Sequence, residues 1–162
     1  MLVDLQATGL LKAIGHDPTL TARPEAVTID LEAPFVVRFA VERIEVPSDL
    51  SPADRERMLE NLRGREVLDA GRFPFLELRG RYDGTLDGGK LAGELVVRGD
   101  PRRFSMDVRG GRDGDCLVAT GTWQGSLNDL GIKPFRALLG ALKLKDWIRL
   151  RLDARLKTSS TS

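Results

Sequence analysis

The sequence predicts a mainly β protein, built as a single antiparallel barrel of about eight strands with two short helices. Three observations point to this fold class. Apolar and polar side chains alternate with a period of two over most of the 162 residues, which is typical of strands with one buried face. Turn signals separate these stretches, and only two segments show helical spacing. No repeat, linker or change of composition divides the chain, so one domain is expected.

The alternation is clearest in a hairpin that runs from Leu91 to Val108. A break at Gly99-Asp100-Pro101 separates its two arms, and each arm alternates strictly between apolar and polar residues. The hairpin is therefore expected to be antiparallel and half-buried. Its expected inward side chains are Leu91, Leu95, Val97, Phe104, Met106 and Val108.

The other strands follow from the same alternation and from the turn residues beside them. Asp83-Gly84, Gly88-Gly89 and the Gly110–Gly114 loop are expected turns, and a bulge near Glu42 or Arg43 is expected to restore the phase in its strand. The predicted strands outside the hairpin are Leu2–Leu5, Thr19–Ala22, Ala26–Glu32, Phe35–Val46, Leu76–Tyr82, Leu117–Trp123 and Trp147–Leu156.

Two amphipathic helices are expected. The first spans Ser51 to Arg63, with Ser51 as N-cap and Pro52 in the first helical position, and we expect it to lie over an opening of the sheet. The second spans Lys133 to Lys143. Its apolar residues recur at positions i, i+3, i+4 and i+7, namely Phe135, Leu138, Leu139 and Leu142.

Charge and hydropathy exclude several classes of partner. The 25 Lys and Arg residues balance the 24 Asp and Glu residues to a net charge of +1, which gives no electrostatic argument for nucleic acid or an anionic membrane. No stretch approaches the roughly 18 apolar residues of a membrane span. The N-terminus lacks the basic and apolar regions of a signal peptide, so a cytoplasmic location is expected.

The residues that could carry chemistry are few. His16 is the only histidine and Cys116 the only cysteine, so neither a zinc site nor a nucleophilic site is indicated. His16 and Asp17 are neighbours, and neighbours on a strand point to opposite faces, so we interpret His16 as a turn residue. We interpret Cys116 as a small packed residue. No enzyme activity, cofactor or metal is therefore predicted.

A group of arginines in the second half of the chain could form a phosphate-binding rim. Acidic residues are interspersed with them, and solvated strand faces normally carry such charges. We therefore interpret the group as solvated surface. The arginines are Arg98, Arg102, Arg103, Arg109 and Arg112.

Four stretches together resemble the YceI family. They are Gly15-His16-Asp17, the LDAGRFPFLELRG run after the first helix, GELVVRGDPRRFSMDV, and LNDLGIKPFRALLGALKLKDWIRLRLDARL. Their order and spacing span nearly the whole chain. The sequence departs from the family pattern at Pro18 and at the Gly99-Asp100-Pro101 turn, and many members carry an export signal.

The resemblance implies a lipocalin-like barrel over residues 1–157, with a disordered tail over residues 158–162. It also implies non-enzymatic binding, storage or transport of a long-chain isoprenoid or lipid-like molecule inside the barrel, and a homodimer. The inward side chains then become candidate ligand-binding residues: Val37, Phe39, Leu76, Leu78, Leu95, Val97, Phe104, Met106, Val108, Trp123, Ile148, Leu150 and Leu152.

From the residues alone, two other functions stay open. The same inward side chains could form a filled core, in which case the protein would be a scaffold whose helices engage a partner. An isomerase or cyclase working inside the barrel would need a buried titratable group, and the candidate positions contain none. The small residues Ala119 and Gly121 favour a pocket, because they are expected to leave open volume beside Trp123.

Overall fold

The computed structural model describes the backbone of residues 2–9, 17–134, 136–137 and 142–158. Nine strands in this part of the chain form one sheet in the order β2-β1-β9-β7-β6-β5-β4-β3, and β8 pairs with β9 beside that path. The strands are β1 (Leu2–Gly9), β2 (Thr19–Thr21), β3 (Phe35–Ala40), β4 (Phe75–Thr85), β5 (Gly88–Val97), β6 (Asp100–Asp113), β7 (Cys116–Gly125), β8 (Arg136–Ala137) and β9 (Leu142–Lys157).

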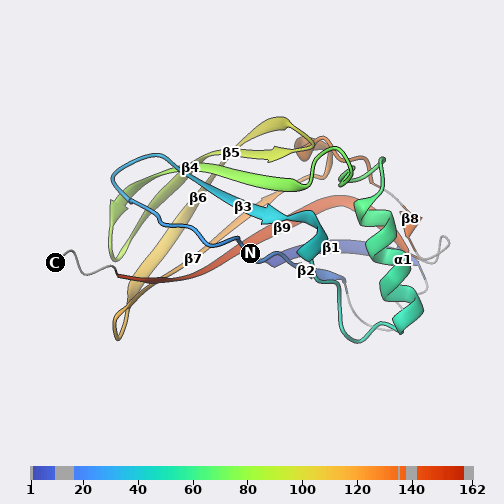
Figure 1. Ribbon diagram of the computed structural model, residues 1–162, viewed down its shortest axis with the longest axis horizontal. Helices are drawn as coiled ribbons and strands as arrows, with labels where there is room; N and C mark the ends of the chain where they lie inside the picture. Colours follow the sequence, from blue (N-terminus) through green and yellow to red (C-terminus); the bar gives the residue numbers. More distant parts are fainter. Residues whose placement is uncertain (1, 10–16, 135, 138–141, 159–162) are drawn as a thin grey trace.

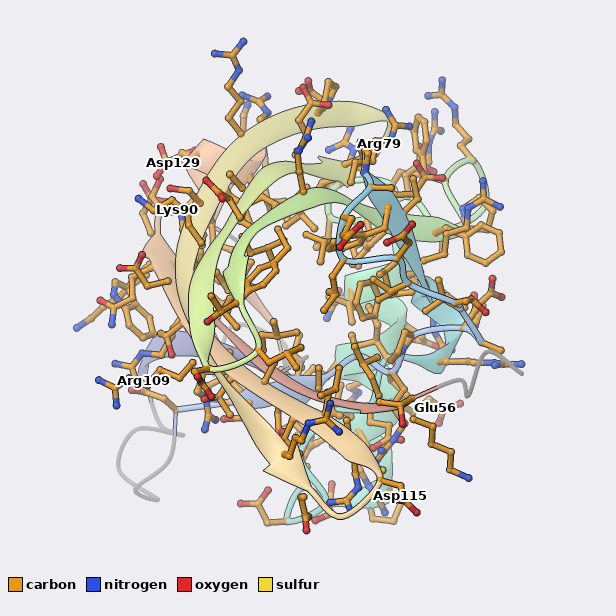
Figure 2. The ribbon with its side chains drawn as sticks, turned by 90° about the vertical axis from the view of Figure 1, so that its left-hand side faces the viewer. Glu56, Arg79, Lys90, Arg109, Asp115 and Asp129 are labelled. Carbon is orange, nitrogen blue, oxygen red and sulfur yellow. The ribbon has the colours of Figure 1, made fainter. Side chains whose placement is uncertain are left out.

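All paired strands are antiparallel, and the sheet curls into a half-barrel (Figure 1). Seen from one end, the strands curve around an interior, and the charged side chains of Arg79, Lys90 and Arg109 point away from it (Figure 2). Alternating residues thus face the interior and the solvent. The mainly β, antiparallel fold class that the sequence predicts is confirmed.

The two ends of the strand order, β2 and β3, meet only briefly. Thr21 and Glu45, which follows β3, exchange two backbone hydrogen bonds of 2.9 Å in an isolated bridge. β1 lies between β2 and β9 in the sheet. It pairs with β9 from Leu142 to Arg151, whereas β9 continues to Lys157. Over its last residues β9 therefore has a described partner strand, β7, on one side only.

The hairpins that form the centre of the sheet have two-residue turns. Arg98 and Gly99 connect β5 to β6 with φ of 54° and 74°, the positive values that a tight hairpin turn of the right twist requires. Three expected turns are misplaced. β4 continues through Asp83 and Gly84, β5 already begins at Gly88, and β6 continues through Gly110 to Asp113. The turns themselves lie at residues 86–87 and 114–115.

The glycines expected to form the turn between β4 and β5 instead let the backbones of these two strands approach closely. Gly84 pairs with Gly89, and a Cβ placed on Gly84 would lie 2.5 Å from the Gly89 Cα. These glycines therefore allow strands to pack closely and do not mark a turn.

The helix α1 (Pro52–Arg63) lies at one end of the half-barrel (Figure 1). Its predicted start is confirmed, since Ser51 Oγ accepts a hydrogen bond of 3.1 Å from the Asp54 N–H and Pro52 opens the helix. Met58 and Leu62 are its buried residues. In the part of the chain that the structure describes, no helix is both long and apolar enough to cross a membrane.

The second predicted helix, Lys133–Lys143, is wrong. Arg136 and Ala137 form β8 and pair with Lys143 and Leu142 of β9. Residues 135 and 138–141 lie outside the described residues. The leucine spacing fits one face of a helix, but Gly140 costs such a helix about 1 kcal/mol relative to Ala. The nearest described residues, Arg136 with Ala137 and Leu142 with Lys143, pair in the sheet instead.

Two further corrections concern the segment around β3. Residues 26–32, predicted as a strand, are irregular. The Glu25 N–H donates a hydrogen bond of 2.8 Å to the Arg38 carbonyl, but no strand ladder follows. In place of the bulge near Glu42, a 3-10 helix, η2 (Val41–Arg43), follows β3 and buries Val41 completely. A second 3-10 helix, η3 (Asn128–Leu130), follows β7.

The predicted C-terminal tail begins with an anchored residue. The Thr158 N–H and Oγ1 both donate hydrogen bonds to the Asp115 carbonyl, at 3.3 and 3.0 Å. Residues 159–162 lie outside the described residues. The end of β9 is thus held beside the β6–β7 turn.

Candidate functional site: an apolar interior in three parts

Among the described residues, three apolar cavities follow one another along the interior of the half-barrel. The largest, called here the main cavity, has a volume of about 340 Å³. A hole of about 20 Å³ follows it, and an inner cavity of about 70 Å³ lies nearest to α1. Phe39 and Leu78 line both the main cavity and the small hole, whereas Leu95 and Leu150 line both the small hole and the inner cavity.

The main cavity lies at the end of the half-barrel opposite α1. Its wall combines inward residues of β3, β4, β5, β6, β7 and β9 with the irregular segment around Val27 and with the β4–β5 turn. Val27 is 40% exposed and Leu86 is 44% exposed, so the rim at these positions is apolar. The apolar residues of the wall are Pro24, Val27, Ile29, Leu31, Phe35, Val37, Phe39, Leu78, Leu86, Leu91, Val108, Leu117, Val118, Ala119, Leu152, Ala154 and Leu156.

Small side chains on β7 and β9 create part of this volume. Ala119 pairs with Ala154 across the two strands, and both line the main cavity. Nearer to α1, the same two strands pair Trp123 with Leu150, and neither of these residues lines the main cavity. Paired residues on one face lie close together, so two alanines leave space that a tryptophan and a leucine fill.

The main cavity also lies where the sheet is incomplete. Its lining includes residues 152–156 of β9, which begin where the pairing with β1 ends at Arg151. The irregular segment with Val27, Ile29 and Leu31 lines the cavity at the sheet's other edge, where Glu25 donates a hydrogen bond to the Arg38 carbonyl of the edge strand β3. The alternation in that segment therefore reflects side chains that line a cavity, without a strand ladder on their backbone.

A layer of packed side chains separates the main cavity from the inner cavity, and we call it the middle layer. The hole within it, about 20 Å³, has room for at most about one water-sized group. Phe39, Phe104 and Met106 are 3%, 8% and 8% exposed. The middle layer consists of Phe39, Leu78, Leu91, Leu95, Phe104, Met106, Leu150 and Leu152.

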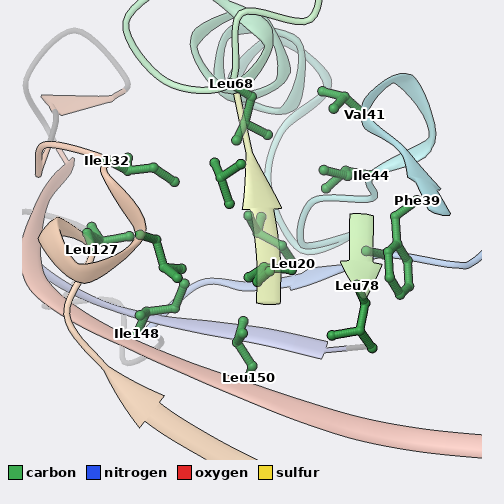
Figure 3. Close-up of a cluster of buried hydrophobic side chains, with 14 of the residues drawn as sticks. Leu20, Phe39, Val41, Ile44, Leu68, Leu78, Leu127, Ile132, Ile148 and Leu150 are labelled. Atoms are coloured by element: carbon green, nitrogen blue, oxygen red, sulfur yellow. The ribbon is translucent and has the colours of Figure 1, made fainter. Parts of the chain in front are cut away.

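The inner cavity lies among the packed side chains of the core beneath α1 (Figure 3). Leu62 of α1 and Leu68 of the following segment cover it, and Leu127, Ile132 and Ile148 line it from β9 and from the segment around η3. Its volume of about 70 Å³ has room for about two water-sized groups. This end of the molecule is therefore close to a solid core.

The structure divides the thirteen sequence-predicted binding residues among these regions. Five line the main cavity: Val37, Phe39, Leu78, Val108 and Leu152. Five line the inner cavity: Leu76, Leu95, Val97, Ile148 and Leu150. Phe104 and Met106 belong to the middle layer alone, and Trp123 lines none of the three cavities.

The expected open volume beside Gly121 and Trp123 is absent. A Cβ placed on Gly121 would lie 2.9 Å from Met106 Sδ and 3.0 Å from the Asp107 carbonyl oxygen. A Cβ on Gly125 would lie 2.3 Å from the Trp123 ring, so that ring extends along its own strand. Of the two small residues that favour a pocket, only Ala119 lines the main cavity. Side chains from β6 fill the space beside the other.

Sequence reasoning missed the residues around Val27, Phe35 and Leu91, and the paired residues Leu117 of β7 and Leu156 of β9. A signal was present for all of them, because each occupies an apolar position of an alternating stretch. Alternation identifies a buried face, but it does not tell which part of that face meets a cavity and which part meets other side chains.

Polar groups at the main cavity have partners of their own. Tyr82 Oη donates a hydrogen bond of 2.6 Å to the Thr85 carbonyl. Arg155 Nη1 lies 2.5 Å from Asp113 Oδ2, and this carboxylate, together with the nearby Cys116 thiol, raises the pKa of Arg155. Asp153 and Arg155 belong to the lining although their positions alternate outward, because β9 has lost its β1 neighbour there.

The other candidates for chemistry lie elsewhere. The buried carboxylate of Asp69 sits in the segment after α1, 3.7 Å from Arg72 Nη1, and lines none of the three cavities. Within the described residues, no group of three His, Cys, Asp or Glu residues could hold a metal ion. His16 lies outside the described residues, and Cys116 is half-buried with a free thiol.

The five arginines do not converge on the main cavity. Arg98 occupies the β5–β6 turn, and Arg102 forms an ion pair with Asp100. Arg103 and Arg109 are exposed on β6 at positions that alternate with its buried residues. Arg112 is exposed near the end of the same strand. None of the five lines the main cavity, which agrees with the interpretation of these residues as solvated surface.

The fold and interior define a class: an antiparallel half-barrel with an apolar cavity at one end and a helix at the other. The Campylobacter jejuni YceI protein has this fold, with a TM-score of 0.62 at 12% identity, covering 96% of this chain and 86% of that one. A mutant of it with a monobromobimane guest aligns with a TM-score of 0.62 at 13% identity and the same coverage. Burkholderia cenocepacia BcnA aligns with a TM-score of 0.62 at 9% identity, covering 96% of both chains.

The chain therefore has the YceI fold, and the resemblance that its sequence shows is confirmed at the level of the fold. No protein-family model matches the sequence, and the search of curated proteins finds no match. The predicted homodimer stays a prediction.

Proposed function

We propose that the protein binds an isoprenoid or lipid-like molecule non-covalently in the main cavity and carries out no reaction on it. The observation that carries this proposal is a cavity of about 340 Å³ with a mostly apolar wall. Ligand sites in proteins begin at about 300 Å³ and are mostly apolar. Each methylene group that leaves water for such a wall contributes about 0.8 kcal/mol.

The placement of the polar groups supports binding by apolar contact. Tyr82 donates a hydrogen bond to a backbone carbonyl and Arg155 donates one to Asp113, so both have partners within the protein itself. An apolar ligand leaves these interactions intact. The incomplete sheet beside β9 and the apolar rim at Val27 and Leu86 offer such a ligand a way in.

Titration with N-phenyl-1-naphthylamine, an uncharged dye that fluoresces in apolar surroundings, tests the proposal. The dye should bind the parent protein, and Ala119→Phe should abolish binding because its ring would enter the main cavity. Thr120→Phe is the matched control, because Thr120 is the exposed neighbour on the same strand. This variant should bind the dye like the parent.

Native mass spectrometry of protein purified without detergent provides the second measurement. A co-purifying adduct of lipid size in the parent, lost in Ala119→Phe, supports binding. The scaffold alternative predicts the opposite: no dye binding, no adduct after exposure to lipid, and equal behaviour of both phenylalanine variants.

A further inference from the structure

We propose that the middle layer forms the floor of the ligand site, so that the main cavity accepts an apolar chain of only about ten to twelve carbon atoms. This inference rests on the proposed function and specifies the class of ligand. It differs from the expectation of a long-chain guest, because it follows from the division of the interior in this particular chain.

The volume of the main cavity limits the length of the chain that it can hold. A methylene group is about as large as a water molecule, whose share of liquid volume is about 30 Å³. The main cavity of about 340 Å³ therefore has room for about eleven such groups. A chain of this length fills the cavity, and the rest of any longer chain must lie elsewhere.

The middle layer stands between the main cavity and the α1 end. A longer chain could reach the α1 end only by passing the middle layer, which holds a hole of about 20 Å³. Phe104 and Met106 are both buried, and a Cβ on the facing Gly121 would come within 2.9 Å of Met106 Sδ. A hole of this size holds about one methylene group at most, so a chain cannot pass unless these side chains move.

Only the small inner cavity lies beyond the middle layer. The inner cavity of about 70 Å³ would add space for about two more methylene groups even if it were reached. The carbons of a longer chain would remain on the open side, past the exposed Val27 and Leu86, where they stay partly in water. Binding should therefore stop improving once the main cavity is full.

A series of saturated fatty acids from eight to eighteen carbons tests this directly, because the head group stays constant while the chain grows. Each acid displaces N-phenyl-1-naphthylamine from the parent protein. We expect affinity to rise about fourfold for each added methylene up to about ten to twelve carbons and then to level off. Affinity that continues to rise through eighteen carbons would overturn the inference.

Two variants of the floor sharpen the test. Phe104→Ala should remove the largest barrier between the cavities and move the plateau to chains at least two carbons longer. Met106→Ala should do the same to a smaller extent, and it keeps the test possible if Phe104→Ala does not fold. Plateaus that stay at the parental length in the folded variants contradict the inference.

Met58→Ala is the matched control for Met106→Ala. Met58, on the buried face of α1, is 3% exposed and lines none of the three cavities, so its truncation should leave the plateau at the parental chain length. An equal shift in both methionine variants would mean that the core loosens generally, and would overturn the role of the floor. Failure of the parent to bind the dye would instead refute the proposed function itself.

Discussion

The two ends of the half-barrel are built on the same strands, yet one end holds a cavity and the other a core. At the α1 end, Val41 is fully buried and Leu62 is 6% exposed, and the helix covers the interior. At the opposite end, the covering segment makes one backbone hydrogen bond to β3, from Glu25 to Arg38. Inward-facing apolar residues therefore become core or cavity wall according to what covers them and how large their partners are.

The largest expected difference between the ends is in tolerance of a buried charge. Leu62→Asp places a carboxylate in the core beneath α1, and we expect it to lower the free energy of unfolding by at least about 4 kcal/mol. Val27→Asp places the same group at a position that is 40% exposed on the rim of the main cavity, and should change stability by less than about 0.5 kcal/mol.

Urea denaturation of both variants and dye titration of the folded ones measure this contrast. Val27→Asp should weaken dye binding while leaving stability nearly unchanged. If Leu62→Asp were as stable as Val27→Asp, the α1 end would not be a packed core, and the contrast between the ends would be lost.

A smaller effect is expected within one strand, where β7 passes from one region to the other. Gly121→Phe must displace Met106, and should cost about 1 to 3 kcal/mol of stability through overpacking. Ala119→Phe extends into the main cavity instead, and should cost less. Thermal unfolding of the two variants compares them. A greater loss in Ala119→Phe would indicate that the cavity is filled in solution.

The outer face, unlike both interior regions, should contribute little. Glu77 accepts hydrogen bonds from Arg79, at 2.7 Å, and from Arg38, at 3.1 Å, and the Arg79 bond is the main cause that lowers the pKa of Glu77. A folded-state pKa below the unfolded value stabilises the protein above the unfolded pKa. That contribution is lost as the pH falls through the folded pKa.

Glu77→Gln should therefore lower stability by less than about 1 kcal/mol at neutral pH, because both arginines are half-exposed. The difference from the parent should shrink at an acid pH below the lowered folded-state pKa of Glu77, where the glutamate is protonated as well. Urea denaturation at the two pH values measures it. A difference that grows in acid would contradict the sign of the pKa shift.

The sequence by itself determined the elements whose signal is local. Strict alternation predicted the β5–β6 hairpin, and Ser51 with Pro52 predicted the start of α1, because a cap and a helix-compatible φ act within one turn. The two small residues that pair across β7 and β9, Ala119 and Ala154, were also visible in the sequence. Its consequence, a cavity, needed the register that places the two alanines side by side.

Only the tertiary structure decided where alternation corresponds to a strand and where a small residue leaves space. Val27, Ile29 and Leu31 alternate like a strand, but their backbone forms no ladder, because alternation reports a buried face and not a hydrogen-bonding partner. Gly121 resembles Ala119 in the sequence, yet Met106 from β6 fills its space. Volume depends on which side chains the fold brings face to face, and a single strand does not contain that information.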